Sequence, residues 1–207
     1  DAAPVLINEA EDENPWGVSF KKGLFDMAND SNLFSTQAEL DARGGKKIGR
    51  QYQFPSGHHL PLYEAKMLHQ FDHRFASYDE PESANDVSIG SKKNAEFLSL
   101  PRYWISESDL PLMSQWWVSY REIVRSTDIR TGIFSPLPKS GVGDTVGLVL
   151  FEDGTEGHTT AFLSNANTFI FDFSVRQSVG GTHLNIYLSK QLPVHPPERY
   201  TPQLLEY

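Results

Sequence analysis

The chain has 207 residues, of which 39% are hydrophobic and 12% aromatic, so it is long and apolar enough to bury a core. It contains no cysteine, which excludes disulfides and thiolate zinc sites and is consistent with a reducing, cytoplasmic location. A net charge of −9 argues against a free-standing DNA-binding protein, because phosphate neutralisation needs Lys and Arg. The apolar runs are too short to span a bilayer, so no membrane partner is expected.

Residues 1–15 carry five acidic side chains and no basic one, which accounts for more than half of the net negative charge. Together with Pro4, Pro15 and the lack of a sustained hydrophobic period, this composition predicts an acidic linker. Residues 16–207 are predicted to form one folded unit. The chain starts without Met, and we expect it to be a fragment of a larger protein.

Five segments are predicted to contain strands, because apolar residues alternate with polar ones or β-branched residues are concentrated there. They are residues 16–20, 59–63, 102–105, 120–135 and 146–151. Ser35 or Thr36, followed by Glu39, forms a helix-capping pattern. A short helix is therefore predicted at this point, and Gly44-Gly45 is expected to end it.

The segments between these strands are predicted to be less regular. Residues 64–74 are expected to form one or two helical turns. Ser106 or Ser108 is expected to cap a turn that leads to the tryptophan pair at 116–117. Stretches that combine Pro, Gly and polar residues predict loops. These loops are residues 76–95, 136–138 and 141–144.

Residues 159–178 are predicted to form the longest helix, because apolar side chains recur there with a helical period. Phe162, Phe169 and Phe173 are expected to pack this helix onto the core. Gly180-Gly181 is expected to end it, since two glycines permit positive φ and close approach of another backbone. Strands mixed with scattered helices, without βαβ repeats, predict an α+β fold with a mixed or antiparallel sheet and peripheral helices.

Three sequence blocks stand out. The first is Leu60–Arg74, which reads LPLYEAKMLHQFDHR, and the second joins YREI at 120–123 to TDIRT at 127–131. The third covers 172–197, where a helix end, a double glycine, a polar THLN segment and a KQLPVHPP run follow one another. Taken alone, the third block is also what a helix C-cap followed by a proline-rich linker looks like.

In this order, the three blocks resemble the target recognition domain of adenine-specific DNA methyltransferases and restriction–modification enzymes. Ala65 stands where that family has glycine. The resemblance implies a module that reads double-stranded DNA from the major groove while a separate domain flips and methylates the adenine. It also implies that this methyltransferase domain lies N-terminal in the same polypeptide and binds S-adenosylmethionine. Neither an Asn-Pro-Pro-Tyr motif nor a glycine-rich cofactor turn occurs in the chain, so no cofactor and no catalytic residue are expected in this fragment.

The resemblance and the residue chemistry together give eight candidate DNA contacts, whose side chains can bind phosphates or base edges. They are Lys66, His69, Arg74, Arg130, Arg176, Thr182, His183 and Asn185. The segment 182–185 ranks highest, because polar side chains after a double glycine suit a protruding loop. Two structural alternatives stay open: Arg176 can pair with Asp172 one helical turn back, and Arg74 with Asp72.

Two other functions remain open from the sequence. Glu64 and Lys66 match the second half of a metal-dependent nuclease signature, in which carboxylates hold Mg²⁺; the nearest upstream acid is Asp41. His69 and His73 have the spacing of a metal pair on a helix, although a structural or phosphate-binding role is favoured. The acidic balance also fits a structural or interaction domain of a defence complex that reads no bases.

Overall fold

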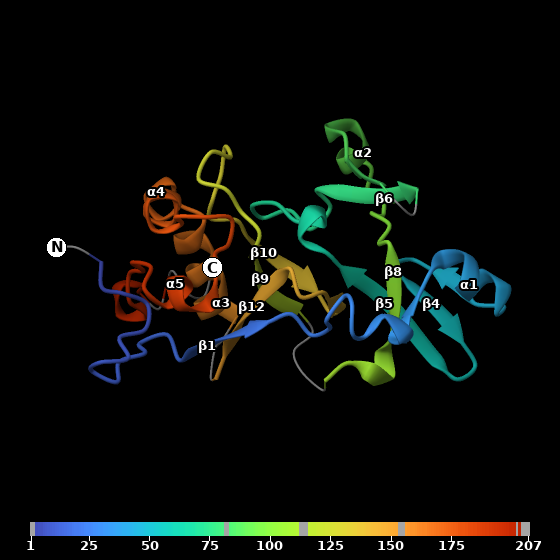
Figure 1. Ribbon diagram of the computed structural model, residues 1–207, viewed down its shortest axis with the longest axis horizontal. Coiled ribbons are helices and arrows are strands. Elements are labelled where there is room, and N and C mark those ends of the chain that lie inside the picture. Colours follow the sequence, from blue (N-terminus) through green and yellow to red (C-terminus); the bar gives the residue numbers. More distant parts are fainter. Residues whose placement is uncertain (1–2, 81–82, 112–115, 153–155, 202, 204–207) are drawn as a thin grey trace.

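The computed structural model describes residues 3–80, 83–111, 116–152, 156–201 and 203, and these form an α+β fold with two main sheets (Figure 1). The first sheet is antiparallel, with β1 and β10 at its edges among the described strands. In spatial order its strands are β1 (Val18–Lys22), β12 (Val146–Phe151), β9 (Trp116–Arg121) and β10 (Phe134–Pro138). The predicted strands at 16–20 and 146–151 are confirmed.

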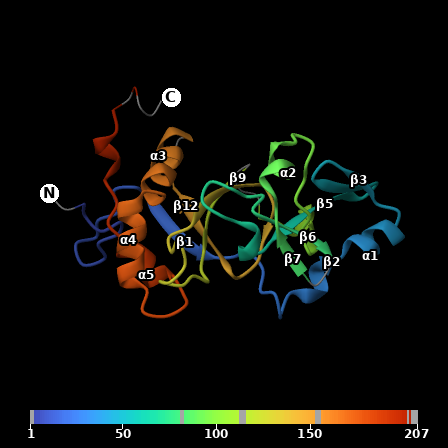
Figure 2. The ribbon, with the colours of Figure 1, turned by 90° about the horizontal axis from the view of Figure 1, so that it is seen from above.

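Three helices gather at one end of the molecule beside the first sheet (Figure 2). They are α3 (Glu156–Ala166), α4 (Phe169–Ser178) and α5 (Ile186–Lys190). Phe162 of α3 and Phe171 of α4 are buried with Phe134 of β10, and the ring of Phe134 meets both edge-on. The helices and the sheet therefore share one aromatic core.

The second sheet is mostly antiparallel and lies at the other end of the molecule. Its strands are β2 (Phe34–Ser35), β8 (Tyr103–Ser106), β5 (Gly57–Tyr63), β4 (Gln51–Phe54) and β3 (Lys46–Ile48), with β11 (Gly141–Val142) parallel to β5. Helix α1 (Gln37–Ala42) begins with the predicted capping box, in which Thr36 and Glu39 bond each other's backbone amides. Gly44 follows with a φ of +77°, as a residue that ends a helix commonly does.

The two sheets are joined by a shared cluster of buried side chains. Tyr63, the last residue of β5, and Met67, four residues later, pack with Trp117 of β9 and with Val146 and Leu148 of β12. The indole Nε1 of Trp117 donates to the carbonyl of Ser140, next to β11. The halves of the molecule are thus held by continuous packing.

The long helix predicted at 159–178 is wrong. The structure has two helices, α3 and α4, because the Thr168 side chain accepts a hydrogen bond from the amide of Phe171 and starts a new helix. The change of direction also alters which face is buried. Phe162 packs as predicted, whereas Phe169 and Phe173 are 83% and 63% exposed.

Three further local predictions are wrong. Residues 76–95, predicted as a loop, contain the hairpin β6 (Ala76–Glu80) and β7 (Ser83–Asp86) and the helix α2 (Ile89–Lys93). Residues 136–138 belong to β10, where prolines are tolerated at a sheet edge. Residues 141–144, also predicted as a loop, contain β11 at Gly141–Val142. The helical turn predicted within residues 64–74 is present as a single 3₁₀ turn, Ala65–Met67, and a tight turn follows it.

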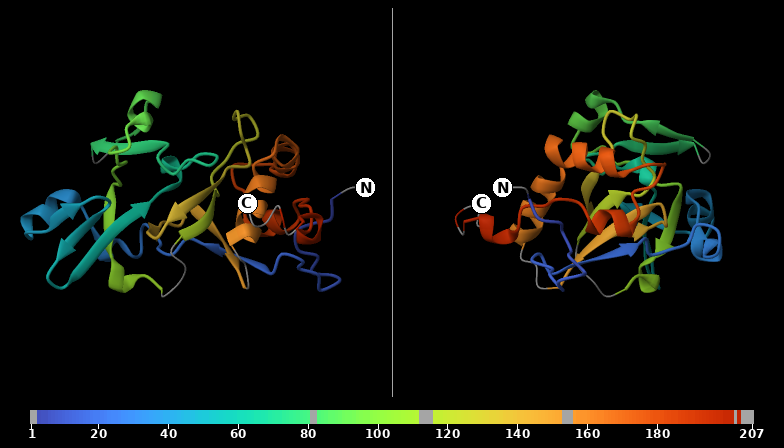
Figure 3. Two further views of the ribbon diagram at one scale, coloured as in Figure 1. Left: turned by 180° about the vertical axis from the view of Figure 1, so that it is seen from behind. Right: turned by 60° about the vertical axis from the view of Figure 1, so that its left-hand side comes forward.

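Within the N-terminal stretch predicted as a linker, residues 4–7 pair with the C-terminal segment, whereas residues 9–15 are exposed. The amide of Leu6 donates to the carbonyl of Leu192 at 2.9 Å, and that of Val194 to Pro4 at 3.0 Å. The side chain of Leu6 is buried in the same cluster as α3 and α4. The entering and leaving segments of the chain therefore run side by side (Figure 3).

Candidate nucleic-acid interface

The structure brings the three sequence blocks together around the loop between β9 and β10, residues 122–133, which we call the β9–β10 loop. The segment after the double glycine pairs with the start of this loop: Val124 donates to the carbonyl of Thr182 at 3.0 Å, and Leu184 to that of Glu122 at 2.8 Å. On its other side the loop faces the 3₁₀ turn of the first block, and the two line one groove. Figure 3 shows the loop projecting from the sheet beside α4.

We call this groove, which has a volume of about 330 Å³, the cation groove. Three basic side chains line it: Lys66 from the first block, and Arg121 and Arg125 from the second. Lys66 and Arg125 are exposed. Arg121 is half-buried, donates to the carbonyl of Leu68, and lies over the ring of Phe75 at 5.4 Å. Because arginine stays protonated even where burial lowers its pKa, all three side chains are positive at neutral pH.

Two acidic side chains, Glu64 and Asp128, also line the cation groove. Burial raises the pKa of the Glu64 carboxyl above the ordinary value, and a hydrogen bond with Tyr78 offsets part of that effect. Oε1 of Glu64 is buried and has no hydrogen-bond partner within the described part of the chain. The structure thus leaves one carboxyl oxygen of Glu64 without a donor, and carboxyl oxygens of Glu and Asp accept from cytosine N4 in protein–DNA complexes.

The predicted reading segment, residues 182–185, is only partly available. Thr182 and His183 are exposed, and their Oγ1 and Nδ1 atoms lie 3.0 Å apart. Leu184 is buried, and the Asn185 side chain accepts from the amide of Leu188 as the N-cap of α5. The structure makes no use of the positive φ and close approach that Gly180-Gly181 permits. Neither glycine has a positive φ, and a Cβ added at either would meet open space.

Arg130 and Arg176 are engaged by partners within the protein, which favours a structural role for both over the predicted DNA contacts. Arg130 is buried and donates to the carbonyls of Asn167 and Thr168 at 2.9 and 3.3 Å. Arg176 donates to three carbonyls of the β9–β10 loop and to the carboxylate of Asp172 at 3.4 Å. The structural alternative of an Arg176–Asp172 pair is therefore confirmed.

Asp172 lies at the centre of these contacts. Its Oδ1 accepts from the amides of Thr131 and Gly132, both at 2.7 Å, and lies 3.8 Å from Nε of Arg130. We call Asp172, Arg130 and Arg176 the anchor network. It satisfies both a buried carboxylate and the backbone of the β9–β10 loop, and so fixes the loop against α4.

The remaining two candidates are also engaged. Arg74 donates to the carbonyls of Lys92 and Phe97, at 3.2 and 3.5 Å, and its own amide, rather than its guanidinium, bonds Asp72. His69 is half-buried and stacks on Phe75 with ring centroids 4.6 Å apart. Burial lowers the pKa of His69, which keeps the ring neutral. The structure assigns both residues to the support of the turn rather than to an open surface.

The metal-dependent alternatives lack their ligand geometry. His69 and His73 do not share a helix, and burial lowers the pKa of His73 to about 4. Asp41 lies on α1 and accepts from the hydroxyl of Tyr52 at 2.8 Å. Among the described residues, no group of three His, Asp or Glu side chains is placed to hold a metal ion.

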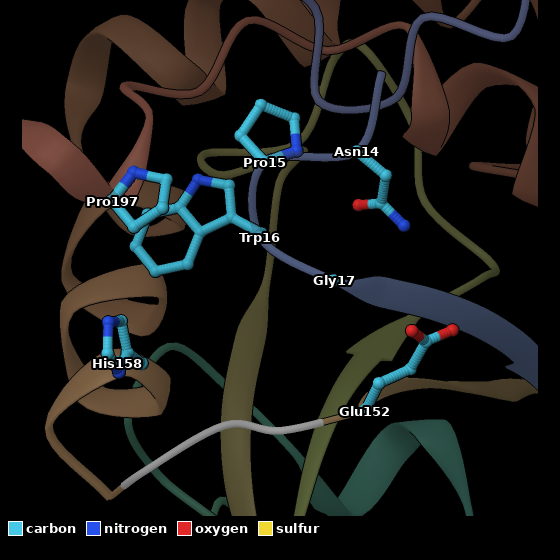
Figure 4. Close-up of a pocket in the computed structure, with 7 residues that line it drawn as sticks. All are labelled: Asn14, Pro15, Trp16, Gly17, Glu152, His158 and Pro197. Carbon is cyan, nitrogen blue, oxygen red and sulfur yellow. The ribbon is translucent and has the colours of Figure 1, made fainter. Parts of the chain in front are cut away.

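One cavity outside the cation groove borders helix α3, and another borders the two ends of the chain. The larger, of about 630 Å³, has walls from α3, β10 and the turn at Phe71, and we call it the aromatic groove. The smaller, of about 290 Å³, surrounds Trp16, which lies between Pro197 and His158 in Figure 4. The indole of Trp16 is buried and donates to the carbonyl of His195 at 3.0 Å, so this cavity belongs to the junction between the two ends of the chain.

Sequence reasoning missed Arg121, Arg125, Asp172 as a structural centre, and Phe71. Arg121 could have been predicted from the sequence, because it belongs to the second block. Comparison with protein-family models, with curated proteins and with solved structures found no match for the chain. No helix in the described part of the chain has the length and apolar character needed to cross a membrane.

Proposed function

We propose that this chain is the DNA-recognition module of an adenine-specific DNA methyltransferase or restriction–modification enzyme of the cytoplasm. In this proposal the cation groove and the exposed pair Thr182–His183 face the duplex. One observation carries the proposal: the first two blocks, far apart in the sequence, line one groove with cationic side chains, and the third block pairs with the β9–β10 loop of its wall through Ile123 and His183. Loops held together on a rigid sheet are the usual place for recognition residues.

Each part of the groove has a distinct task in this proposal. Lys66 and Arg125 neutralise phosphates, because both are exposed and positively charged. Glu64 and His183 supply hydrogen-bonding groups for base edges. S-adenosylmethionine is bound by a methyltransferase domain that precedes the module in the same polypeptide. The module does not methylate or cut DNA by itself.

The net charge of −9 sets the expected strength of binding. Only a few cations face the groove, so the chain alone should bind duplex DNA weakly and lose affinity as salt rises, with a slope set by this small number of phosphate contacts. The test is a binding titration of the chain with a randomised duplex pool between low and physiological salt. Selection of a common sequence supports the proposal, and nanomolar affinity at physiological salt contradicts the assignment of phosphate contacts.

Matched variants make the test specific. Lys66→Ala and Arg125→Ala should each reduce the slope of log affinity against log salt by about 0.9, as the loss of one phosphate contact does. Lys46→Ala, at an exposed position on β3 at the edge of the second sheet, is the control and should leave the slope unchanged. Equal effects of all three would show that the groove has no special role.

The nuclease is the alternative that uses the same residues, Glu64 and Lys66, with Mg²⁺. It is disfavoured because Glu64 and Asp128 line the groove without a third ligand: the described residues supply no group of three His, Asp or Glu side chains placed to hold a metal ion. DNA cleavage that requires Mg²⁺ and is lost in Glu64→Gln would establish it instead. A domain that supports a defence complex without reading bases would bind every duplex in the pool equally or not at all.

A further inference from the structure

Phe71 combines two features that are unfavourable in a folded protein. Its φ is +56°, a left-handed conformation that a bulky side chain rarely adopts. Its side chain is also 55% exposed, so the strained backbone does not bury the ring. Strain of this kind persists only where the surrounding structure enforces it, and it is concentrated at functional sites.

The surroundings of Phe71 do enforce this conformation. His69 and Asp72 close the turn by exchanging backbone hydrogen bonds of 2.7 and 2.9 Å. The amide of Phe71 donates to the carbonyl of Phe134 on β10 at 3.2 Å. The side chain of Gln70 donates to the carbonyl of Asn167, between α3 and α4, at 2.6 Å. The turn is thus fixed on both sides, and the ring is held at the surface.

The ring of Phe71 borders the aromatic groove, whose volume of about 630 Å³ is typical of small-molecule sites. Trp116, Pro136, Leu137 and Leu163 provide its apolar surface. His73 adds a second ring, which is uncharged at neutral pH because burial lowers its pKa to about 4.

Arg50 adds a positive charge at this groove, and Glu156 at the start of α3 adds a negative one. One N–H group of Arg50 is donated to the hydroxyl of Tyr63 at 2.8 Å. A guanidinium carries five donors, so others are available to an anionic ligand. A flat ligand with a negative charge matches this combination of rings and guanidinium.

The wall formed by β10 argues against a peptide as the ligand. Arg121 of β9 donates to the carbonyl of Ile133, so by antiparallel alternation residues 134, 136 and 138 direct their polar backbone atoms to the open edge. Two of these three, Pro136 and Pro138, have no N–H. An added peptide strand would find few donors here, whereas a ligand that binds through ring faces needs none.

We propose that Phe71 and the aromatic groove form a stacking site for an unpaired nucleobase of the bound DNA, with Arg50 against the adjoining phosphate. This inference rests on the proposed function, because it assumes that DNA is bound. The two grooves are close in the fold: the carbonyl of Leu68, three residues before Phe71, accepts from Arg121 of the cation groove. Stacking on an aromatic side chain is sequence-tolerant, so this site adds affinity for an extruded base rather than sequence preference.

The test compares two duplexes of the same sequence, one fully paired and one with a single unpaired 2-aminopurine. Wild type should bind the second duplex more tightly and quench the 2-aminopurine fluorescence. Phe71→Asn should lose roughly 5- to 150-fold in affinity for the unpaired duplex, together with the quenching, and should bind the paired duplex as before. Asn adopts positive φ more readily than Phe, so this variant keeps the turn. Phe71→Tyr retains a ring and should behave as wild type.

Three outcomes overturn the inference in distinguishable ways. Equal affinity of Phe71→Asn and wild type for the unpaired duplex, with unchanged quenching, rejects base stacking and leaves the proposed function intact. Phe71→Asn is also compared with wild type for association with a separately added methyltransferase domain. If the variant binds DNA as wild type does but loses this association, the groove receives an apolar protein side chain. Failure of wild type to bind either duplex, even at low salt, rejects the proposed function itself.

Discussion

The anchor network and the cation groove lie on opposite sides of the β9–β10 loop, and both are built from arginines and acidic side chains. In the anchor network, Arg130 and Arg176 are surrounded by backbone carbonyls and share the carboxylate of Asp172. In the cation groove, Lys66 and Arg125 face solvent. Residue type is therefore a poor guide to function on this surface. What separates the two regions is whether the fold offers each charge an internal partner.

The largest expected effect is the loss of the anchor carboxylate. Asp172→Ala should lower the free energy of unfolding by about 3–5 kcal/mol, because it leaves Arg130 buried without its counter-charge and strips the amides of Thr131 and Gly132 of their acceptor. Urea unfolding measures this. Asp172→Asn keeps an acceptor oxygen and should cost less. A loss below about 1 kcal/mol in Asp172→Ala would show that the network does not hold the loop.

The second test asks whether the Asn185 side chain supports helix α5 or contacts DNA. As the N-cap of α5, Asn185→Ala should cost about 1 kcal/mol of stability, whereas Asn185→Asp should retain the cap. DNA affinity should be unchanged in both variants once they are folded. Base readout by this side chain would instead appear as an altered sequence preference without a loss of stability.

The third test concerns the groove cations. Lys66→Ala and Arg125→Ala are expected to change the free energy of unfolding by less than about 0.5 kcal/mol, because both side chains are exposed. Their effect should appear only in the salt dependence of DNA binding. A loss of stability comparable to that of Asp172→Ala would remove the distinction between the two regions.

The smallest effect is expected from Glu64, through its dependence on pH. Burial raises the pKa of this carboxyl in the folded protein above the ordinary value of 4.5, so the folded state binds the proton more tightly than the unfolded chain. The contribution of Glu64 is therefore most favourable below pH 4.5 and declines as the pH rises through the folded pKa. Glu64→Gln should be more stable than wild type at pH 7, and the difference should vanish near pH 4. A difference that is constant with pH would mean that the carboxyl is not desolvated.

Local sequence signals were sufficient for part of the fold. The capping box at Thr36 and Glu39, the strand periodicity at 16–20 and 146–151, and the α+β class are all found in the structure. The junction at Thr168 was missed because a threonine within an apolar helical pattern gives no sign that its hydroxyl will cap a new helix.

The site was less predictable than the fold, for a physical reason. Whether Arg130 and Arg176 are free depends on carbonyls of distant residues, and no local pattern encodes those contacts. The strained Phe71 was equally hidden, because Phe134 and Asn167, which are distant in the sequence, help to fix the turn that contains it.

The pairing of residues 4–7 with 190–194 has a consequence for how this unit can be handled. The segments by which the polypeptide enters and leaves the fold lie next to each other. The residues between them therefore form a unit whose two ends are adjacent in space. A unit with this topology can be transplanted between hosts, or its ends joined and reopened elsewhere, with little disturbance of the interior. Transfer of the unit between residues 4 and 194, with both paired segments kept, is the natural way to move its binding properties into another protein.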